Sequence, residues 1–327
     1  QNIILTENNI DEDQTAVSGE GNGADGAMEK GGRDFMYAGN LTDVGGMREL
    51  LARHGFSFSK ALGQNFLINP SVCPRMAEAC REGMPERFAV LEIGPGIGVL
   101  TRELAGVAEK VVSVELDRRL LPVLAETVGE CSNVEIVQGD AMKLDLAELI
   151  RRTAPGLPLA VCANLPYYIT SPLLMRLLES RLPARSITVL VQKEAAERLC
   201  ARPGTRACGA VTLAVEYYAR AERLFAVSRG SFLPPPKVDS TVMRLWVREE
   251  PPCLVEDEAA MFRLIRAAFG QRRKTIVNAL VGGGYPKEAA RAALTAAGIS
   301  PSARAEELPL ERFAALADAF GRPARNG

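Results

Sequence analysis

The segment that decides the fold of this chain runs Ala89-Val-Leu-Glu-Ile-Gly-Pro-Gly-Ile-Gly98. An apolar run interrupted only by Glu92 predicts a buried strand over residues 89–93, and a helical run over 99–105 follows the glycine turn. A strand, a glycine turn and a helix N-terminus together expose backbone N–H groups to a nucleotide-like ligand. The segment therefore predicts the first strand and helix of an open α/β sheet with a ligand site at its edge.

The spacing of these glycines separates two kinds of nucleotide-binding enzyme. A hydride-transfer enzyme is expected to carry Gly-x-Gly-x-x-Gly, but the sixth position counted from Gly94 is Val99. The spacing instead resembles the first motif of S-adenosylmethionine-dependent methyltransferases. A glycine turn with a purely structural role is the alternative that the segment alone leaves open.

Three further predicted strands carry a polar side chain at their carboxyl end. The set is Glu115 after a strand over 110–114, Asp140 after a strand over 134–137, and Asn164 after a strand over 159–162. Glu115 lies 21 residues after Gly94, where a carboxylate reaches the hydroxyls of a ribose, and Asp140 can accept from an adenine amine. Because ligands of open α/β sheets bind at the carboxyl ends of strands, the set predicts one nucleotide site.

The turn Asn164-Leu165-Pro166-Tyr167 has the chemistry of an amine-methylating site. An adenine exocyclic amine is a poor nucleophile because its lone pair is delocalised into the ring. The side-chain carbonyl of Asn164 and the backbone carbonyl of Leu165 can accept its two N–H groups and draw the nitrogen toward tetrahedral geometry. Pro166 stiffens the turn, and Tyr167 offers a flat face for an extruded base. An ordinary strand-to-loop turn is the alternative.

The remaining elements complete an α/β sheet and add a second domain. A short helix is expected from Arg48, a helix from Ser171, strands over 187–191, 210–218 and 238–247, and a helix over 193–200. Beyond Pro251-Pro252, Ala-rich helices are expected over 256–269, 272–281, 287–297 and 310–320. The predicted fold class is α/β, a Rossmann-like sheet with helices on both faces, followed by a small all-helical domain.

Composition agrees with two domains and an appended segment. The 327 residues are 47% hydrophobic and 24% charged, which allows a sizeable core. Residues 1–45, rich in Gly, Asn, Asp and Glu, are expected to be a flexible acidic extension, before a sheet domain over 46–250 and a helical domain over 251–327. The net charge of −1 hides an asymmetry, since residues 51–327 hold 36 Lys and Arg against 30 Asp and Glu.

Basic side chains cluster in the helical domain without an intervening acid. The cluster comprises Arg263, Arg266, Arg272, Arg273 and Lys274, with Phe269 among them. A solvated helix face is the common explanation of such a run, but the absence of acids favours contacts to nucleic-acid phosphates.

Cysteine and histidine usage excludes several other classes. The seven cysteines are scattered without a Cys-x-x-Cys pair, which indicates reduced thiols and a cytoplasmic protein. The single histidine, His54, gives little support to a multi-histidine metal site, so no metal is expected. No apolar run approaches the roughly 18 residues that a membrane span needs.

Together these motifs resemble the small-subunit ribosomal RNA adenine dimethyltransferases. The resemblance rests on Leu-Gly-Gln-Asn-Phe-Leu (62–67), Glu-Ile-Gly-Pro-Gly (92–96), Glu115, Gly-Asp-Ala-Met (139–142), Asn-Leu-Pro-Tyr-Tyr-Ile-Thr (164–170), Phe-Leu-Pro-Pro-Pro-Lys-Val-Asp-Ser (232–240) and Phe-Gly-Gln-Arg-Arg-Lys-Thr (269–275). It implies a monomer that binds S-adenosylmethionine and converts two adjacent adenosines near the 3′ end of small-subunit rRNA to the N6,N6-dimethyl form, with the pre-ribosomal small subunit as partner.

The resemblance also implies roles for individual residues. Asn65 and Leu67 would close over the cofactor, Gly94 would back its methionine part, Glu115 would hold the ribose and Asp140 the adenine. Asn164, Leu165 and Tyr167 would handle the target base, and Asn164 would also contact the cofactor. The basic segment would bind the RNA. Phe232 lies on a loop stiffened by three prolines, and the loop alone allows either a core anchor or a second aromatic wall for that base. The resemblance implies the wall, with Phe232 as a catalytic residue on the other face of the base.

Three alternatives stay open. One is an enzyme of the same fold that dimethylates large-subunit rRNA and confers macrolide resistance, against which Leu165 and the Gln-Arg-Arg-Lys-Thr segment speak. Another is a mainly non-catalytic ribosome assembly factor, although intact Asn164, Tyr167 and Glu115 favour activity. A protein glutamine methyltransferase would carry an Asn-Pro-Pro-Tyr type of turn, from which Leu165 departs.

Overall fold

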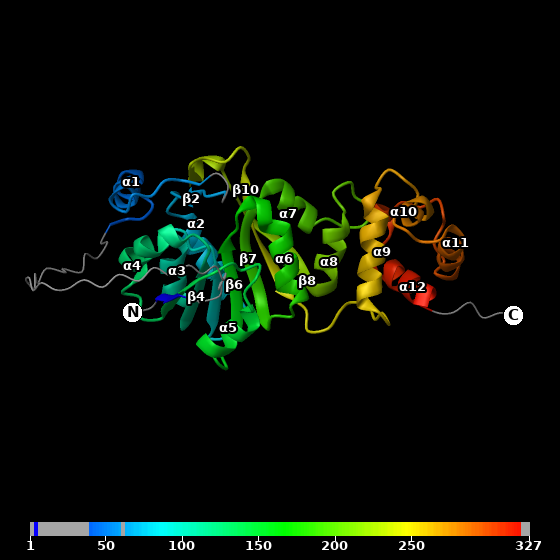
Figure 1. Cartoon of the computed structure of the whole chain (residues 1–327), viewed down its shortest axis with the longest axis horizontal. Coiled ribbons are helices and arrows are strands. Elements are labelled where there is room, and N and C mark those ends of the chain that lie inside the picture. The colour runs from blue at the N-terminus through cyan, green and yellow to red at the C-terminus, as the bar shows by residue number, and fades with distance from the viewer. Residues whose placement is uncertain (1–2, 6–38, 60–62, 322–327) are drawn as a thin grey trace, which may run out of the picture.

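The structure, a computed structural model, describes residues 3–5, 39–59 and 63–321, and its main element is an eight-stranded sheet (Figure 1). The strands follow the order β1 (Ile3–Leu5), β5 (Val134–Gln138), β4 (Lys110–Glu115), β3 (Ala89–Ile93), β6 (Leu159–Asn164), β7 (Ala184–Gln192), β10 (Ser240–Val247) and β8 (Ala219–Val227). Pairing is parallel from β1 to β7, whereas β10 runs antiparallel to both neighbours. A second, two-stranded sheet joins β2 (Phe66–Leu67) to β9 (Phe232–Leu233).

Helices cover both faces of the sheet, as expected for strands that are apolar on both sides. One face carries α1 (Val44–Arg53), α2 (Val72–Arg81), α3 (Val99–Val107) and α4 (Leu121–Val128), and the other carries α5 (Leu146–Thr153), α6 (Thr170–Glu179) and α7 (Lys193–Leu199). In β3, Val90 packs into the first core and Leu91 into the second. The predicted Rossmann-like sheet is therefore confirmed.

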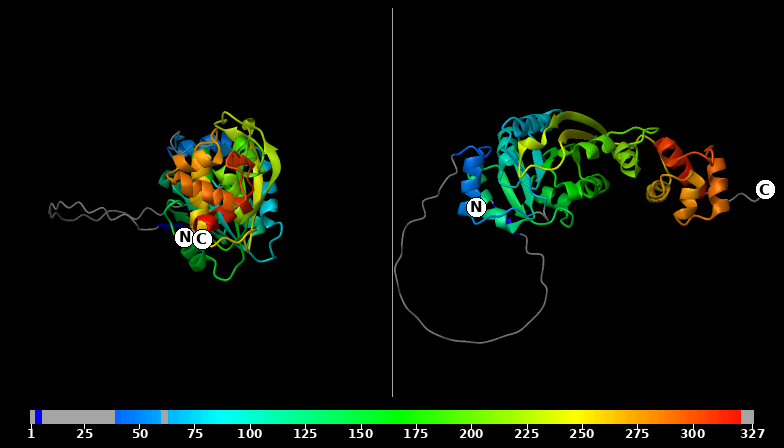
Figure 2. Two further views of the ribbon diagram at one scale, coloured as in Figure 1. Left: turned by 90° about the vertical axis from the view of Figure 1, so that its right-hand side faces the viewer. Right: turned by 90° about the horizontal axis from the view of Figure 1, so that it is seen from above.

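A helical domain follows the sheet domain at the far end of the chain (Figure 2). It consists of α9 (Glu258–Gly270), α10 (Ile276–Gly282), α11 (Lys287–Ala296) and α12 (Leu310–Gly321) around a separate apolar core. Its link to the sheet domain includes apolar side chains of α8 and a polar and aromatic cluster around Glu258. Glu258 of α9 accepts hydrogen bonds from Tyr217, at 3.2 Å, and Tyr218, and Arg181 donates to the same carboxylate at 2.7 Å.

The strand expected over 210–218 was wrong, because these residues form α8 (Ala210–Tyr218) and the strand follows as β8. The β-branched and aromatic side chains of this stretch favour a strand by propensity, but burial on two sides overrides it. Leu213 and Tyr217 pack into the core of the helical domain and Val215 into the core of the sheet domain. Thr212 Oγ1 accepts from Gly209 N at 2.9 Å and starts the helix.

Two further expectations differ from the structure, one for the start of a helix in the helical domain and one for the N-terminal extension. The helix expected from residue 272 begins at Ile276, so Arg272 to Lys274 lie in the connection after α9. Of the extension expected to be flexible over residues 1–45, residues 1–2 and 6–38 lie outside the described residues. Ile3–Leu5 instead form β1, which pairs parallel to β5. No helix in the described ranges is long and apolar enough to cross a membrane.

Candidate active site

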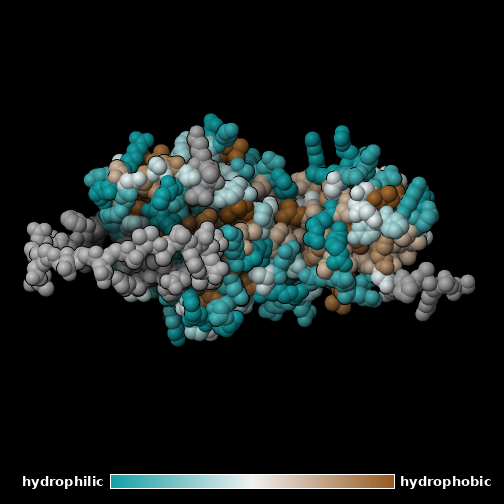
Figure 3. All heavy atoms as spheres, viewed as in Figure 1, coloured by the Kyte–Doolittle hydropathy of each residue, from teal (hydrophilic) through white to brown (hydrophobic). Residues whose placement is uncertain are grey.

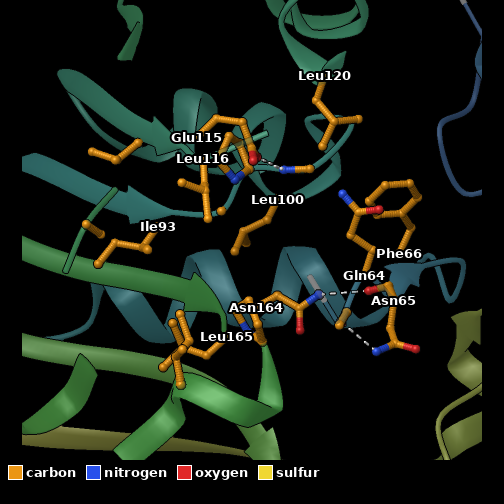
Figure 4. A pocket seen from close by; sticks show the side chains of 18 of the residues that line it. Gln64, Asn65, Phe66, Ile93, Leu100, Glu115, Leu116, Leu120, Asn164 and Leu165 are labelled. Carbon is orange, nitrogen blue, oxygen red and sulfur yellow. Dashed lines mark hydrogen bonds between the residues drawn. The ribbon is translucent and has the colours of Figure 1, made fainter. Parts of the chain in front are cut away.

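A pocket opens at the carboxyl ends of β3, β4, β5 and β6, where the sequence places its polar residues (Figure 4). The space in the pocket and in front of it, open solvent included, is about 1080 Å³. The predicted residues that line it are Asn65, Leu67, Gly94, Glu115, Asp140, Asn164, Leu165 and Tyr167. Residues as far apart in sequence as Asn65 and Tyr167 thus meet at one site, as the rule for open α/β sheets requires.

The glycine turn after β3 shapes one wall of the pocket. Gly94, Gly96 and Gly98 have φ values of +72°, +62° and +87°, a region that residues with a Cβ rarely adopt. A Cβ added at Gly94, which lines the pocket, would meet no atom within 4 Å. The turn therefore leaves room beside its backbone for a ligand, at the place where the resemblance puts the methionine part of S-adenosylmethionine.

Glu115 lies at the tip of β4 with both carboxylate oxygens engaged by backbone N–H groups. Asp117 N donates to Oε1 at 2.8 Å and Gly96 N to Oε2 at 3.2 Å. Burial raises the pKa of this carboxyl to about 7, since the side chain is only 5% exposed and Asp117 adds a like charge. A pair of ribose hydroxyls can donate to these oxygens, so the residue fits the role expected from the sequence.

Asp140 lies at the same edge, after β5. Its Oδ1 accepts from Met142 N at 2.8 Å, which holds the carboxylate against the pocket wall. Ala141 and Met142 line the pocket beside it, so a flat ring there would meet apolar side chains and one carboxylate. This combination fits an adenine.

The segment 63–67 lies across the front of the pocket and is held there by polar contacts. Gln64 Nε2 donates to Asp117 Oδ2 at 2.8 Å, and Asn65 Nδ2 donates to the carbonyl of Gly63 at 2.9 Å. Arg119 beside Asp117 keeps the pKa of that carboxyl below its usual range. Asp117 was not predicted from the sequence. The only signal was its position two residues after Glu115, which alone does not separate a ligand neighbour from a surface acid.

Asn164 closes the pocket floor opposite Glu115 (Figure 4). Its Nδ2 donates to the backbone carbonyl of Asn65 at 3.3 Å. Among the described residues no group donates to Asn164 Oδ1 or to the carbonyl of Leu165. Two acceptors therefore lie at one turn of the pocket, and their contact with an amine stays a prediction.

Tyr167 follows on the short 3₁₀ turn Tyr167–Ile169. Its hydroxyl shares a 2.8 Å hydrogen bond with Ser240 Oγ of β10, and burial raises the pKa of the phenol. The hydroxyl is thereby fixed while the ring lines the pocket. This arrangement suits a rigid stacking platform.

Phe232 does not reach the pocket, which corrects the expectation of a second aromatic wall in this arrangement. Its backbone pairs with Leu67, and its side chain is 2% exposed within the core on the α2 and α3 side. Phe232 therefore supports the front segment from behind. The other interpretation from the sequence, that Phe232 is a core anchor, agrees with its position.

Two side chains of the basic cluster in the helical domain contact other parts of the protein, and three do not contact a described acid. Arg272 Nη2 donates to the carbonyls of Arg206 and Cys208, each at 2.8 Å, and Arg263 lies 3.6 Å from Asp257. Arg266, Arg273 and Lys274 are exposed and have no ion pair with another described residue. Figure 3 shows hydrophilic side chains projecting from this domain. Phosphate contacts by these three side chains stay a prediction.

Comparison with known proteins decides the family. The profile described as "Ribosomal RNA adenine dimethylase" matches residues 55–321, most of the chain. The chain belongs to the ribosomal RNA adenine dimethylase family. Membership confirms the expected class of enzyme, an rRNA adenine dimethyltransferase, and S-adenosylmethionine as its cofactor.

Individual relatives agree. The chain is 47% identical over 286 residues to "Ribosomal RNA small subunit methyltransferase A" of Geobacillus thermodenitrificans, covering 86% of this chain and 97% of that protein. A protein of the same name from Alkaliphilus oremlandii is 42% identical, covering 83% of this chain and 94% of the relative. Among solved structures, a dimethyladenosine transferase from Plasmodium falciparum matches with a TM-score of 0.63 at 27% identity, covering 77% of this chain and 95% of that one.

A solved structure of the alternative class is also similar. The 23S rRNA methyltransferase ErmE matches with a TM-score of 0.57 at 30% identity, covering 79% of this chain and 100% of that chain. The fold is therefore shared by enzymes of both ribosomal subunits. The choice between subunits rests on sequence identity, which is higher toward the small-subunit enzymes.

Proposed function

We propose that this protein dimethylates the N6 amines of two adjacent adenosines near the 3′ end of small-subunit rRNA. The observation that carries the proposal is the pair of acceptors at the Asn164–Leu165 turn to which no described residue donates, on the floor of a pocket that fits S-adenosylmethionine. The names and the 42–47% identity of the small-subunit relatives support the choice of substrate.

The cofactor end of the pocket is formed by residues of β3, β4 and β5. Glu115 would accept from the ribose hydroxyls, Asp140 from the adenine amine, and Gly94 would leave space for the methionine part. When bound, S-adenosylmethionine supplies a methyl group on a positively charged sulfur. Asn65 and Leu67, on the front segment, would cover this end and exclude water.

The other end of the pocket, at the turn after β6, would position the target adenine. Tyr167 would stack on the extruded adenine, because the amine of a paired base is out of reach. Asn164 Oδ1 and the Leu165 carbonyl would each accept one N–H of the amine and hold its lone pair in line with the methyl group. As the nitrogen becomes tetrahedral and positive, both contacts strengthen, which lowers the barrier. The surplus proton would then pass to solvent.

No side-chain base is needed for this chemistry. His54 does not line the pocket, and its Nε2 lies 2.7 Å from Glu126 Oε2. The described residues hold no group of three His, Cys, Asp or Glu that could bind a metal. We propose a metal-independent monomer that acts in the cytoplasm on the pre-ribosomal small subunit, with Arg266, Arg273 and Lys274 on RNA phosphates.

The large-subunit alternative is favoured by one observation, the ErmE likeness. Labelled S-adenosylmethionine offered with unmethylated small subunits, or with large subunits, tests the choice. We expect label in small-subunit RNA only. Label in the large subunit alone would show that the relatives' names mislead for this chain.

A further inference from the structure

The pocket mouth carries an aromatic residue with no role in the cofactor site or at the Asn164 turn. Tyr168 lines the pocket and is 54% exposed. The other two aromatic residues of the lining differ, since Phe66 is 7% exposed and the Tyr167 hydroxyl is bonded to Ser240. An exposed ring that also borders a pocket is a ready contact for a flat ligand.

The ring of Tyr168 is supported from one side by the front segment. A Cβ placed on Gly63 would lie 3.3 Å from Tyr168 Cδ1 and 3.6 Å from Cε1, so the ring packs close to the glycine backbone. Gly63 has a φ of +59°, a conformation that glycine adopts without strain. In the described part of the chain no other aromatic ring stacks on Tyr168.

Its position along the chain places Tyr168 on the substrate side of the mouth. It directly follows Tyr167 on the 3₁₀ turn after β6, the strand that ends in Asn164. Leu116, an exposed apolar residue that also lines the pocket, follows Glu115 of β4 and so belongs to the cofactor side. Tyr168 therefore lies on the side of the pocket that carries the Asn164 turn.

We propose that Tyr168 stacks on the base next to the extruded adenosine. Extrusion removes the stacking partner of that neighbour and leaves one of its faces open, which is part of the cost of flipping. An aromatic ring at the mouth replaces the lost stack whichever base is presented. This inference rests on the proposed function and adds a positioning residue for the RNA, one nucleotide away from the reacting amine.

A double-mutant cycle between the protein and the RNA tests this role. Small subunits are assembled from rRNA in which one of the two adenosines is replaced by guanosine, which stacks well, or by uridine, which stacks weakly. Each particle then has one target and a defined neighbour. The proteins are wild type, Tyr168→Leu, which keeps apolar cover over Gly63, and Tyr168→Phe, which keeps the ring. Tyr285→Leu, which removes a ring packed on Phe320 in the helical domain, is the matched control.

We expect Tyr168→Leu to lower kcat/KM about tenfold beside guanosine and at most about threefold beside uridine, as for a lost base stack. Tyr168→Phe and Tyr285→Leu should stay within about twofold of wild type. Cofactor affinity by calorimetry and the thermal midpoint should not change in Tyr168→Leu.

Three results would overturn the role. Equal losses beside guanosine and uridine would make Tyr168 a support for Gly63 alone. A matching loss of cofactor affinity would assign the ring to the cofactor. No loss in Tyr168→Leu would leave the ring without function. Wild-type transfer to unsubstituted small subunits is measured first, because its absence would instead overturn the proposed function.

Discussion

Asn164 Nδ2 donates to the backbone carbonyl of Asn65 across 3.3 Å, although 99 residues separate the two in the chain. The bond joins the turn after β6 to the segment in front of the pocket. It also sets the direction of the Asn164 amide, because the nitrogen faces Asn65 and no described residue donates to the oxygen. One hydrogen bond therefore leaves an oriented acceptor at the pocket, which is the acceptor that the proposed function uses.

We expect Asn164→Ala to slow the chemical step more than binding. The acceptor matters most as the amine becomes positive, so its loss should lower the single-turnover rate on the order of 10²- to 10³-fold, as for a lost preorganised hydrogen-bonding group. Rapid-quench transfer with saturating cofactor and RNA measures it. RNA affinity from filter binding should stay close to wild type, and a variant that loses affinity but keeps its rate would contradict this role.

Two substitutions should distinguish the role of the Tyr167 ring from the role of its hydroxyl. Tyr167→Ala removes a stacking platform worth roughly 1 to 3 kcal/mol and should weaken RNA binding as well as the rate. Tyr167→Phe keeps the ring and loses only the bond to Ser240, so it should behave like Ser240→Ala. A Tyr167→Phe enzyme as slow as Tyr167→Ala would show that the hydroxyl, not the ring face, is what the reaction uses.

Glu115 should control cofactor affinity and its pH dependence. Glu115→Ala should weaken binding by roughly 1.5 to 3 kcal/mol, the range for hydrogen bonds to a charged group. Burial raises the pKa of Glu115 to about 7 in the protein without ligand, and ribose hydroxyls donate best to the ionised form. Affinity should therefore fall as pH drops below about 7, by up to about tenfold per pH unit.

A matched variant identifies the titrating group. The pKa of Glu92 is also raised to about 7 by burial, but its Oε2 accepts from Thr101 and Ser113 and it does not line the pocket. Calorimetry from pH 6 to pH 8 should show that cofactor affinity still depends on pH in Glu92→Gln and no longer does in Glu115→Gln. The reverse pattern would show that Glu92, not Glu115, is the group whose protonation weakens cofactor binding.

Changing two glycines of the turn after β3 to alanine should lower the unfolding free energy by different amounts. A Cβ on Gly98 would lie 2.7 Å from Val128 Cγ1, so Gly98→Ala should cost about 2 to 4 kcal/mol of unfolding free energy from backbone strain and overpacking. Gly94 has open space, so Gly94→Ala should cost about 1 to 2 kcal/mol for its left-handed backbone.

The same pair tests the cofactor position. The Cβ of Gly94→Ala would occupy pocket space, so this variant should remain folded and lose cofactor affinity. Urea unfolding and calorimetry on both variants check it. Full cofactor affinity in a folded Gly94→Ala protein would show that the ligand does not approach this glycine.

Substitutions in the basic cluster should affect stability at Arg272 and RNA binding at Arg273 and Lys274. Arg272→Gln removes two hydrogen bonds to backbone carbonyls and should lower the unfolding free energy by about 1 to 2 kcal/mol. Changing Arg273 and Lys274 to Gln should leave stability alone and reduce the slope of log affinity against log salt by up to about 0.9 per lost duplex phosphate contact. An unchanged slope in the second variant would make these side chains a solvated surface.

The sheet and the polar residues at one edge of the pocket were predictable from the sequence because both depend on local patterns. Strands buried on both faces are continuous apolar runs, and the residue that ends each run, such as Glu115 or Asn164, must lie at the same edge. The strand expected over 210–218 failed since α8 is buried on two sides by two different cores and shows no polar face. Pattern alone does not separate such a helix from a strand.

Long-range contacts were the part that could not be predicted. Nothing local to Phe232 indicates that its backbone pairs with Leu67 and turns the ring into the core. Arg272 belongs to a uniform basic run, and only the fold brings the carbonyls of Arg206 and Cys208 to it. Tyr168 resembles any loop aromatic until the pocket is formed around it.

The most direct test of the account is the nucleoside composition of small subunits after reaction with this protein. Unmethylated small subunits are incubated with S-adenosylmethionine and either wild type or Asn164→Ala, and their RNA is digested and analysed by mass spectrometry. We predict N6,N6-dimethyladenosine at two adjacent positions near the 3′ end with wild type, and almost none with Asn164→Ala at the same reaction time. Methylation of another atom or nucleoside, or equal product from the two proteins, would contradict the account.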